Sequence, residues 1–355
     1  MTKTLPPFAV AYTPNVPEIL FDLKFTLALS TYQAGKMIFL SAVDKEKLIQ
    51  LPRTFDNAMG VATSADKMAI ACKKELVLLK NFPQLARNYP SKKDTYDSFF
   101  VPRVIYNTGS LDLHDMNFID EKLVAVNTLF SCLAEINDEF SFEPVWKPGF
   151  ITGLAPEDRC HLNGMAVSKN SIEYVTALGT TNTTQGWREN KIGGGVIIHV
   201  PSGEIVLQGM AMPHSPRLYN KKLYFLNSAM GELRICDPEK RTSEVIVKLG
   251  GFARGMARFG DFLFIGISKL RHTTDVFKSL PIAKTSYAGV EVVYLPYKKV
   301  IGQIKYETSV DEIYDVKILP GLCRPGILNS EKLQDQMAVI TPDSSFWGVA
   351  DEKQQ

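Results

Sequence analysis

Hydrophobic and polar positions alternate along most of the chain in short runs that end at turn residues. Between Phe25 and Thr54 the runs TLALST, KMIFLSAV and KLIQLPRT are separated by YQAG and DKE. Such β-branched, aromatic or Leu-rich runs, punctuated by turn residues, are typical of antiparallel strands in a meander. No stretch longer than a few residues carries sustained i, i+3, i+4 apolar spacing, which argues against a parallel α/β fold. The sequence therefore predicts an all-β protein.

A short motif recurs six times, and each copy except the last is followed by further strand-like runs. The copy at Cys160–Val167 reads CHLNGMAV, and the others read NAMGVA, LHDMNF, HSPRLY, ARGMAR and IYDVKI. Each combines leading polar residues with a hydrophobic position, namely Met59, Met116, Met165, Met256 and Val316, whereas Arg217 breaks the rule. Four-stranded units repeated at intervals of roughly 40–50 residues are the signature of a β-propeller.

The two ends of the chain complement each other. The segment Phe25–Thr54 has three strand-like runs but no leading one, whereas DEIYDVKILPG near the C-terminus is a leading strand without a meander behind it. We therefore predict a six-bladed β-propeller over residues 25–319, closed by the C-terminal strand joining the N-terminal blade. Residues 1–24 would be an N-terminal extension and residues 320–355 an irregular C-terminal extension. Seven blades, one of them degenerate, or a pair of β-sandwiches are the alternatives.

The bulk composition fits a soluble domain with a large core. The chain has 355 residues, is 45% hydrophobic and carries a formal net charge of +2, so nothing biases it toward nucleic acid or anionic membrane. The N-terminal MTKTLPPFAV lacks the apolar core of a signal peptide. The five cysteines include no CxxC pair and fit reduced thiols. We expect a cytoplasmic protein that binds neither nucleic acid nor membrane, with its oligomeric state left open.

Three of the five histidines begin leading strands in consecutive units: His114, His161 and His214. Leading strands line the central channel of a propeller, so these side chains would meet at one mouth of that channel. Three imidazoles can occupy one face of a divalent ion and leave a position open for water or substrate. The sequence thus predicts a metal site, with zinc or iron favoured and calcium also open. The alternative is that each histidine only hydrogen-bonds a neighbouring blade.

Charged and aromatic side chains are expected at the same mouth. A guanidinium there could bind a carboxylate or phosphate, or it could balance the charge of channel carboxylates. The candidate catalytic residues are Arg254, Arg217, Asp115, Asp315 and Tyr314. The candidate substrate-binding residues are Tyr32, Asn163, Trp187, Arg188, Lys269 and Arg271.

The strings STYQAGK, NTLFSCL, LAPEDRCHLNGMA, GWRENK, MPHSPRLY and EIYDVK resemble a family of bacterial propeller proteins known mainly as a domain of unknown function. This resemblance runs from about Tyr12 to Leu319 and implies a propeller with a shared site on one face, with no reaction attached. The layout is more loosely similar to the six-bladed peptidyl-hydroxyglycine amidating lyases, in which three channel histidines hold zinc. Strictosidine-synthase-like propellers are similar too, and hold a divalent ion mostly with carboxylate and amide ligands. Both likenesses are analogies of fold and ligand type.

Three functions remain open from the sequence. The first is a metal-dependent lyase or hydrolase that acts on a small polar molecule or a modified peptide. The second is an iron-dependent oxygenase, because three histidines suit iron as well as zinc. The third is a non-catalytic scaffold whose long loops, Leu178–Gly195 and Ser268–Leu280, bind a protein or peptide partner. The chain has no G-x-S-x-G, phosphate loop, dinucleotide fingerprint or H-E-x-x-H motif.

Overall fold

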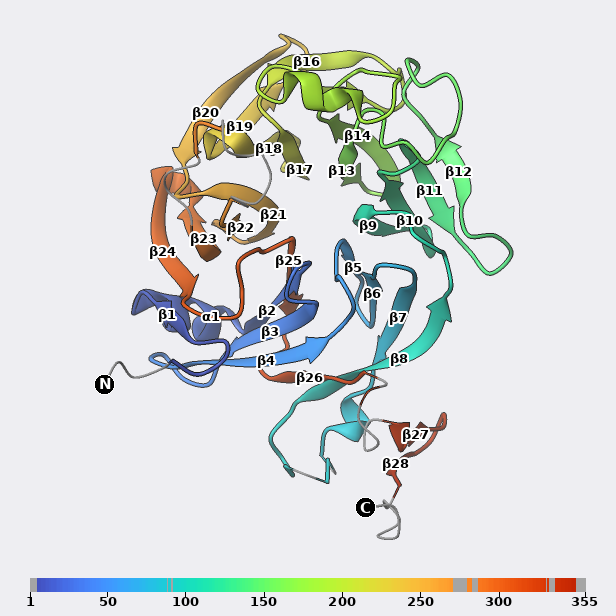
Figure 1. Cartoon of the computed structure of the whole chain (residues 1–355). Helices are drawn as coiled ribbons and strands as arrows, with labels where there is room; N and C mark the ends of the chain where they lie inside the picture. The colour runs from blue at the N-terminus through green and yellow to red at the C-terminus, as the bar shows by residue number, and fades with distance from the viewer. Residues whose placement is uncertain are drawn as a thin grey trace.

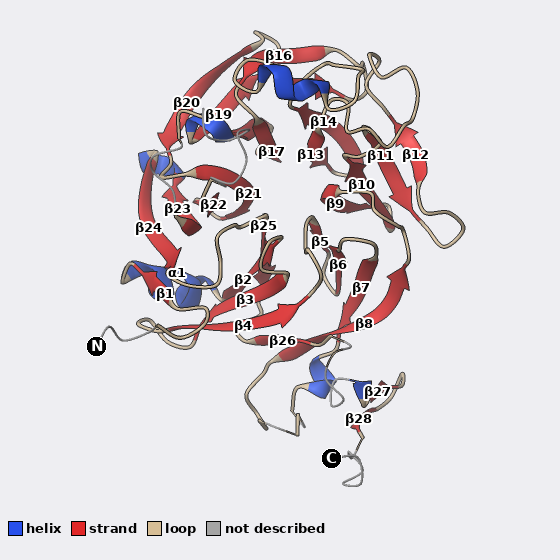
Figure 2. Ribbon diagram, viewed as in Figure 1, coloured by secondary structure: helices blue, strands red, loops and turns tan. Residues whose placement is uncertain are grey.

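The computed structural model describes residues 5–87, 89–90, 92–270, 280–282, 287–329, 331 and 336–348. Within these residues, six antiparallel sheets stand side by side in a ring around a central axis (Figure 1). Strands make up nearly all of the ring, and short helices lie at its rim and between strands (Figure 2). The predicted all-β, six-bladed propeller is therefore confirmed.

Each blade is named here by its place in the ring, and its strands are given from the axis outward. Blade 1 consists of β25 (Asp315–Pro320), β2 (Phe25–Thr31), β3 (Lys36–Ala42) and β4 (Leu48–Thr54). Blade 2 consists of β5 (Val61–Thr63), β6 (Lys67–Ala71), β7 (Leu76–Asn81) and β8 (Ser98–Tyr106). Blade 3 consists of β9 (Leu113–Ile119), β10 (Lys122–Asn127), β11 (Cys132–Ile136) and β12 (Glu143–Trp146).

The second half of the ring repeats this order. Blade 4 consists of β13 (Leu162–Ser168), β14 (Ser171–Ala177), β15 (Gly195–His199) and β16 (Ile205–Met210). Blade 5 consists of β17 (Pro213–Tyr219), β18 (Lys222–Asn227), β19 (Glu232–Asp237) and β20 (Thr242–Lys248). Blade 6 consists of β21 (Phe252–Phe259), β22 (Phe262–Ser268), β23 (Ala288–Tyr294) and β24 (Lys299–Tyr306).

The ring closes through blade 1, as the complementary chain ends predict. The C-terminal strand β25 runs antiparallel to β2, with Phe25 opposite Pro320 at one end and Ser30 opposite Asp315 at the other. The strand nearest the axis in this blade thus comes from the far end of the chain. Closure depends on hydrogen bonds between segments almost 300 residues apart in sequence, rather than on a short connecting loop.

Both extensions add ordered structure outside the blades. At the N-terminus, β1 (Val10–Tyr12) pairs with β24 at the outer edge of blade 6, and helix α1 (Asn15–Leu23) buries Val16 and Leu20 against the core. The C-terminal extension, which we expected to be irregular, contains β26 (Pro325–Ile327), parallel to β8, and the hairpin of β27 (Ala338–Ile340) and β28 (Ser345–Trp347). Trp347 of this hairpin packs against Tyr89 and Phe99 beside blade 2.

The recurring motif forms the inner strands and the turns that lead into them. Its hydrophobic position is exposed by 2% or less in all five copies that keep it, which are Met59, Met116, Met165, Met256 and Val316. These side chains belong to apolar clusters that run between adjacent blades. In five of the six blades the motif therefore orients the blade by burying one side chain against its neighbour.

Side-chain oxygens on every second blade accept hydrogen bonds from the backbone of the next blade. Asp315 accepts from the Val61 N–H at 3.1 Å, Asp115 from the Met165 N–H at 3.1 Å, and Ser215 from the Gly255 N–H at 3.0 Å. The acceptors lie on blades 1, 3 and 5, and the donors lie on blades 2, 4 and 6. The inner ring is thus built from three similar pairs of blades.

The donating blades carry a glycine in the motif where they meet the following blade. A Cβ atom on Gly60 would lie 3.0 Å from the His114 backbone, and one on Gly164 would lie 3.1 Å from the Ser215 nitrogen. On Gly255, which has φ +73°, it would lie 2.7 Å from the Asp315 Cα. Glycine therefore lets successive inner strands approach to a distance that a side chain would block.

Candidate functional site

The three predicted histidines line one cavity of about 290 Å³. His114 lies at the start of β9, His161 directly before β13, and His214 at the start of β17. Because all three stand where an inner strand begins, they share one end of the ring. The sequence prediction that these residues meet is supported by the cavity that they share. We call this cavity the histidine pocket.

Each of the three rings is held by a hydrogen bond at Nδ1. His114 Nδ1 donates to the carbonyl oxygen of Asp112 at 2.9 Å, and His214 Nδ1 donates to that of Met212 at 2.9 Å. Since a carbonyl oxygen only accepts, the proton of these two rings is on Nδ1 and the lone pair is on Nε2. Nε2 is thus the ring nitrogen that remains for a ligand in the pocket.

Burial lowers the pKa of His114 and His214 well below the ordinary histidine value, and the nearby positive charge of Arg254 lowers it further. Both rings are therefore neutral at physiological pH. A neutral imidazole offers a hydrogen-bond acceptor or a metal ligand at Nε2, whereas an imidazolium offers neither.

His161 is bound to a carboxylate instead of a carbonyl. Its Nδ1 lies 2.9 Å from Oδ1 of Asp158, and Oδ2 of Asp158 accepts a hydrogen bond from Trp187 Nε1 at 3.0 Å. The Trp187 ring packs on the His161 ring at 4.5 Å between centroids, and the His114 ring meets the His161 ring edge-on at 4.8 Å. His161 is thus packed against two rings and oriented by a carboxylate.

Arg254 and Tyr314 also line the histidine pocket, and the Tyr314 ring lies 5.4 Å from the His114 ring between centroids. The Arg254 guanidinium lies 3.9 Å above the centre of the Tyr314 ring and 3.5 Å from Oε1 of Glu312. A cation over an aromatic face is stabilised by the ring quadrupole and is held in one orientation. Burial raises the pKa of the Tyr314 hydroxyl above its ordinary value, so this group is a poor source of phenolate.

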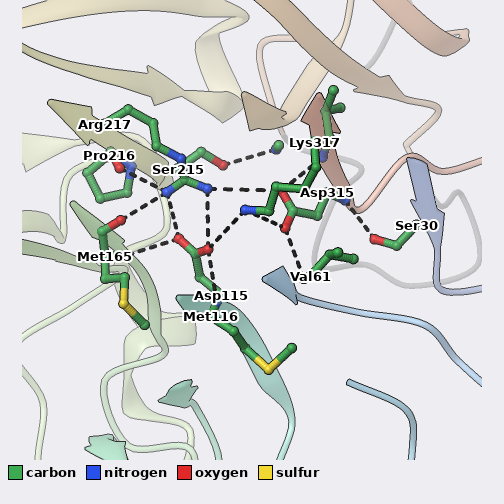
Figure 3. Close-up of polar contacts among 12 residues, drawn as sticks. Ser30, Val61, Asp115, Met116, Met165, Ser215, Pro216, Arg217, Asp315 and Lys317 are labelled. Atoms are coloured by element: carbon green, nitrogen blue, oxygen red, sulfur yellow. Dashed lines mark hydrogen bonds and ion pairs between the residues drawn. The ribbon is translucent and has the colours of Figure 1, made fainter. Parts of the chain in front are cut away.

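Arg217, Asp115 and Asp315, predicted as catalytic, lie together further along the inner strands and do not line the histidine pocket (Figure 3). Arg217 binds Asp115 through two hydrogen bonds, at 2.7 and 3.2 Å, and Lys317 lies 3.1 Å from Asp315. Backbone N–H groups of Met165 and Val61 donate to the two carboxylates.

Burial acts to raise the pKa of Asp115, but the charges of Arg217 and Lys317 outweigh it and hold that pKa below its ordinary value. We call these four charged residues the axial ion cluster, and its contacts join blades 1, 2, 3, 4 and 5.

The predicted substrate-binding residues divide into three groups. Tyr32, Trp187, Arg188 and Lys269 line the histidine pocket, although Trp187 is buried and holds Asp158. Asn163 does not line it, because its side chain turns into blade 4 and accepts a hydrogen bond from Thr176 at 2.7 Å. Arg271 lies outside the residues that the structure describes.

Sequence reasoning missed Asp158 and the apolar walls of the pocket. Asp158 stands three residues before His161, and this spacing was the one available signal for the pair. Phe252 and Met212 also line the pocket, but they look like ordinary core residues in the sequence.

The predicted zinc, iron or calcium ion has no preformed ligand set in the part of the chain that is described. There, no group of three or more His, Cys, Asp or Glu side chains is arranged to hold a metal ion. The metal site thus stays a prediction. The described residues also include no helix whose length and hydrophobicity would let it cross a bilayer.

Comparisons with known proteins agree with the fold. A laminin–nidogen complex contains a chain with TM-score 0.55 and 10% identity, covering 84% of this chain and 100% of that chain. A protein of unknown function from Bacteroides caccae has TM-score 0.51 and 9% identity, covering 83% and 98%. At these identities the likeness concerns the fold alone, and no curated protein matches the chain. A family model described as "Domain of unknown function (DUF4915)" matches residues 14–328, so the chain belongs to that family.

Proposed function

We propose that the histidine pocket is the active site of a metal-dependent enzyme, a lyase or hydrolase that acts on a small polar molecule. The observation that carries this proposal is the shared arrangement of His114, His161 and His214. Each ring is held at Nδ1 by an oxygen of the protein, and Nε2 is left for the pocket. Histidines that bind metals in proteins are held in this way, by a carbonyl or carboxylate at the other ring nitrogen.

The protonation states of the pocket also favour a metal. Histidine must be neutral to bind a metal ion, so a low pKa removes competition from protons. His114 and His214 meet this condition through burial. The positive charge of Arg254 opposes a divalent ion in the same pocket, and the carboxylates of Glu312 and Asp112 offset it. A bound divalent ion would act as a Lewis acid or activate a water molecule.

Metal content decides this proposal. We expect protein purified without a His-tag, or reconstituted with zinc or ferrous iron, to hold a stoichiometric amount of metal by mass spectrometry. The His114→Gln and His214→Gln variants should lose it. If the wild-type protein binds no transition metal even after reconstitution, the proposal fails. Retention of iron in preference to zinc would favour the oxygenase over the lyase or hydrolase.

A second candidate is proton transfer by His161 without a metal. It is favoured by the 2.9 Å contact between His161 Nδ1 and the Asp158 carboxylate, since a carboxylate at Nδ1 orients the ring and leaves the lone pair on Nε2. Diethyl pyrocarbonate acylates unprotonated imidazole and can report whether Nε2 is presented in this way. We expect Asp158→Asn to slow acylation of His161 several-fold, while acylation of His199 is unchanged. Equal rates at His161 in both proteins would exclude the second candidate.

The structure gives little support to the hypothesis of a non-catalytic scaffold that binds a partner through its long loops. Trp187, the aromatic residue that would anchor a partner on the loop Leu178–Gly195, is 5% exposed and packs against His161. Most of the loop Ser268–Leu280 lies outside the described residues. The histidine pocket is therefore a better candidate site than either loop.

A further inference from the structure

We propose that the histidine pocket recognises a small organic molecule that carries one carboxylate with a hydroxyl or amino group beside it. This inference rests on the proposed function only in using the same pocket as the binding site. It requires neither a bound metal nor a chemical step, so it can fail or succeed independently of them.

The first argument comes from the hydrogen bonds of two arginines with similar burial. Arg217 and Arg254 have side chains that are 15% and 14% exposed. The Arg217 guanidinium donates hydrogen bonds to the Asp115 carboxylate and to the carbonyl oxygens of Met165 and Pro216. Within the described residues, the Arg254 guanidinium has the Glu312 ion pair at 3.5 Å and the Tyr314 ring, but no hydrogen bond. The Arg254 guanidinium lines the pocket, so its N–H donors are available to an acceptor on a ligand, and a carboxylate fits their planar fork.

The second argument is the charge of the pocket, which favours a single negative charge on the ligand. Among the described residues, three cations line it: Lys269 is paired with Asp311 at 2.7 Å, Arg188 lies over the Trp187 ring, and Arg254 lies over the Tyr314 ring. Glu312 and Asp112 bring two carboxyl groups to the same walls. A dianionic phosphate would meet two stacked guanidinium groups and the two carboxyl groups of Glu312 and Asp112, whereas a single carboxylate matches the planar fork of Arg254.

The third argument is the tautomer of the histidines. Nδ1 of His114 and His214 is committed to backbone carbonyls, so each ring presents Nε2 as an acceptor. Acceptors repel a carboxylate oxygen and require an O–H or N–H donor. A ligand that fills the pocket must therefore place such a donor next to the group that binds Arg254.

The remaining walls fit an apolar body of limited size. Phe252, Met212, Met59 and Leu270 also line the pocket. A volume of about 290 Å³ has room for roughly ten groups the size of a water molecule. Mandelate, which joins a phenyl ring, a hydroxyl and one carboxylate, has the required groups and size and serves as the probe.

The test is calorimetric binding of matched probes to protein dialysed against EDTA. Mandelate carries both polar groups, phenylacetate lacks the hydroxyl, benzyl alcohol lacks the carboxylate, and phenyl phosphate replaces the carboxylate with a dianion. We expect mandelate to bind, and each of the other three probes to bind at least tenfold more weakly, which corresponds to about 1.4 kcal/mol for each lost interaction.

Variants of Arg254 connect the binding to the proposed contact. Arg254→Gln should weaken mandelate binding at least tenfold, and Arg254→Lys should retain part of it because the charge remains. Arg258→Gln is the matched control: Arg258 lies on the same strand, and its Nε donates to the carbonyl oxygen of Gly260 outside the pocket. Circular dichroism and thermal unfolding would confirm that each variant is folded.

Each contrary result contradicts the inference. No binding of mandelate at millimolar concentration, equal affinity for benzyl alcohol and mandelate, tighter binding of phenyl phosphate, or wild-type affinity in Arg254→Gln would each overturn it. Mandelate binding by protein that never takes up metal would support this inference and contradict the metal-dependent function. Stoichiometric metal in a protein that binds no probe would do the reverse.

Discussion

Arg217 and Arg254 show how position along an inner strand decides the role of a residue. Arg254 stands near the start of β21 and faces the histidine pocket, whereas Arg217 stands further along β17 and faces the axis. There Arg217 meets Asp115, which is 4% exposed and could not remain ionised without a partner. Two residues of the same type therefore serve different ends: one joins blades, and the other is available to a ligand.

Replacing Arg217 with methionine should destabilise the protein strongly. The variant leaves the buried Asp115 carboxylate without its bidentate partner, and loss of one member of a buried ion pair costs about 3–5 kcal/mol. Urea denaturation measures this loss. The control is Arg241→Gln, which removes an exposed ion pair with Glu204 and should cost less than about 1 kcal/mol. Similar midpoints for the two variants would contradict the structural role of the axial ion cluster.

The neutral histidines predict how stability depends on pH. In the unfolded chain histidine takes up a proton near its ordinary pKa of about 6.5, whereas the folded pKa of His214 is well below that value. Below a pH of about 6.5 the unfolded state therefore binds more protons than the folded state. The free energy of unfolding should thus decrease as the pH is lowered, by up to about 1.4 kcal/mol per pH unit for each such group. His214→Gln should show a shallower fall between pH 7 and pH 5 in urea denaturation. Parallel curves for variant and wild type would show that His214 does not titrate as described.

At the scale of the element, the six inner strands are alike in sequence but alternate in their contacts. Blades 1, 3 and 5 supply side-chain acceptors, and blades 2, 4 and 6 supply backbone donors and a glycine. Because each glycine meets the backbone of the next blade, the spacing of the inner strands depends on the missing side chain. This spacing also places the three histidines, which belong to blades 3, 4 and 5, around one pocket.

Gly164→Ala should therefore disturb the contact between blades 4 and 5. An added Cβ would lie 2.5 Å from Pro216 Cδ and 2.9 Å from Thr176 Oγ1, both much closer than normal contacts. Overpacking of this kind costs about 1–3 kcal/mol. Gly153→Ala is the matched control, since nothing lies within 4 Å of its added Cβ. Equal thermal unfolding temperatures for the two variants would show that the strands have room to separate.

The features that could be predicted from the sequence are those that follow from its repeated motif. A periodic motif predicts strands, blade number and the shared position of His114, His161 and His214, because equivalent positions in a ring face the same axis. Contacts made by loops were not predictable in this way. Asp158 and Trp187 reach His161 from segments outside the repeat, and Asn163, predicted to bind substrate, accepts a hydrogen bond from Thr176 within blade 4. The partners of a polar side chain depend on tertiary packing, which a local pattern does not specify.

For the whole molecule, the central question is what keeps the ring closed. Strand β25 completes blade 1 and carries Asp315 and Lys317 into the axial ion cluster. It also buries Val316 and Leu319, and the turn before it buries Ile313. Full burial of such a side chain contributes about 1.5–3 kcal/mol, so these three alone represent a large part of the 5–15 kcal/mol that typically separates folded from unfolded proteins.

A chain that ends at residue 310 should therefore fail to form a cooperative propeller. Blade 1 would lose its inner strand, Asp115 and Arg217 would lose half of the axial ion cluster, and the histidine pocket would lose Tyr314 and Glu312. The control ends at residue 329: it loses Trp347 and its packing on Tyr89, but it keeps β25 and β26. We expect the control to unfold cooperatively in urea with a reduced midpoint.

Adding the missing segment back as a peptide distinguishes the loss of strand β25 from a general folding defect of the shortened chain. A synthetic peptide spanning residues 311–329 contains β25 and β26 and should bind the chain that ends at residue 310, because the edge of β2 is left unpaired. Binding should restore cooperative unfolding, and a peptide with Asp315→Asn and Lys317→Met should restore it less well because the axial ion cluster is incomplete. If the chain ending at residue 310 unfolds at the same urea concentration as the full-length protein, closure by β25 is not what stabilises the ring, and the five remaining blades are sufficient.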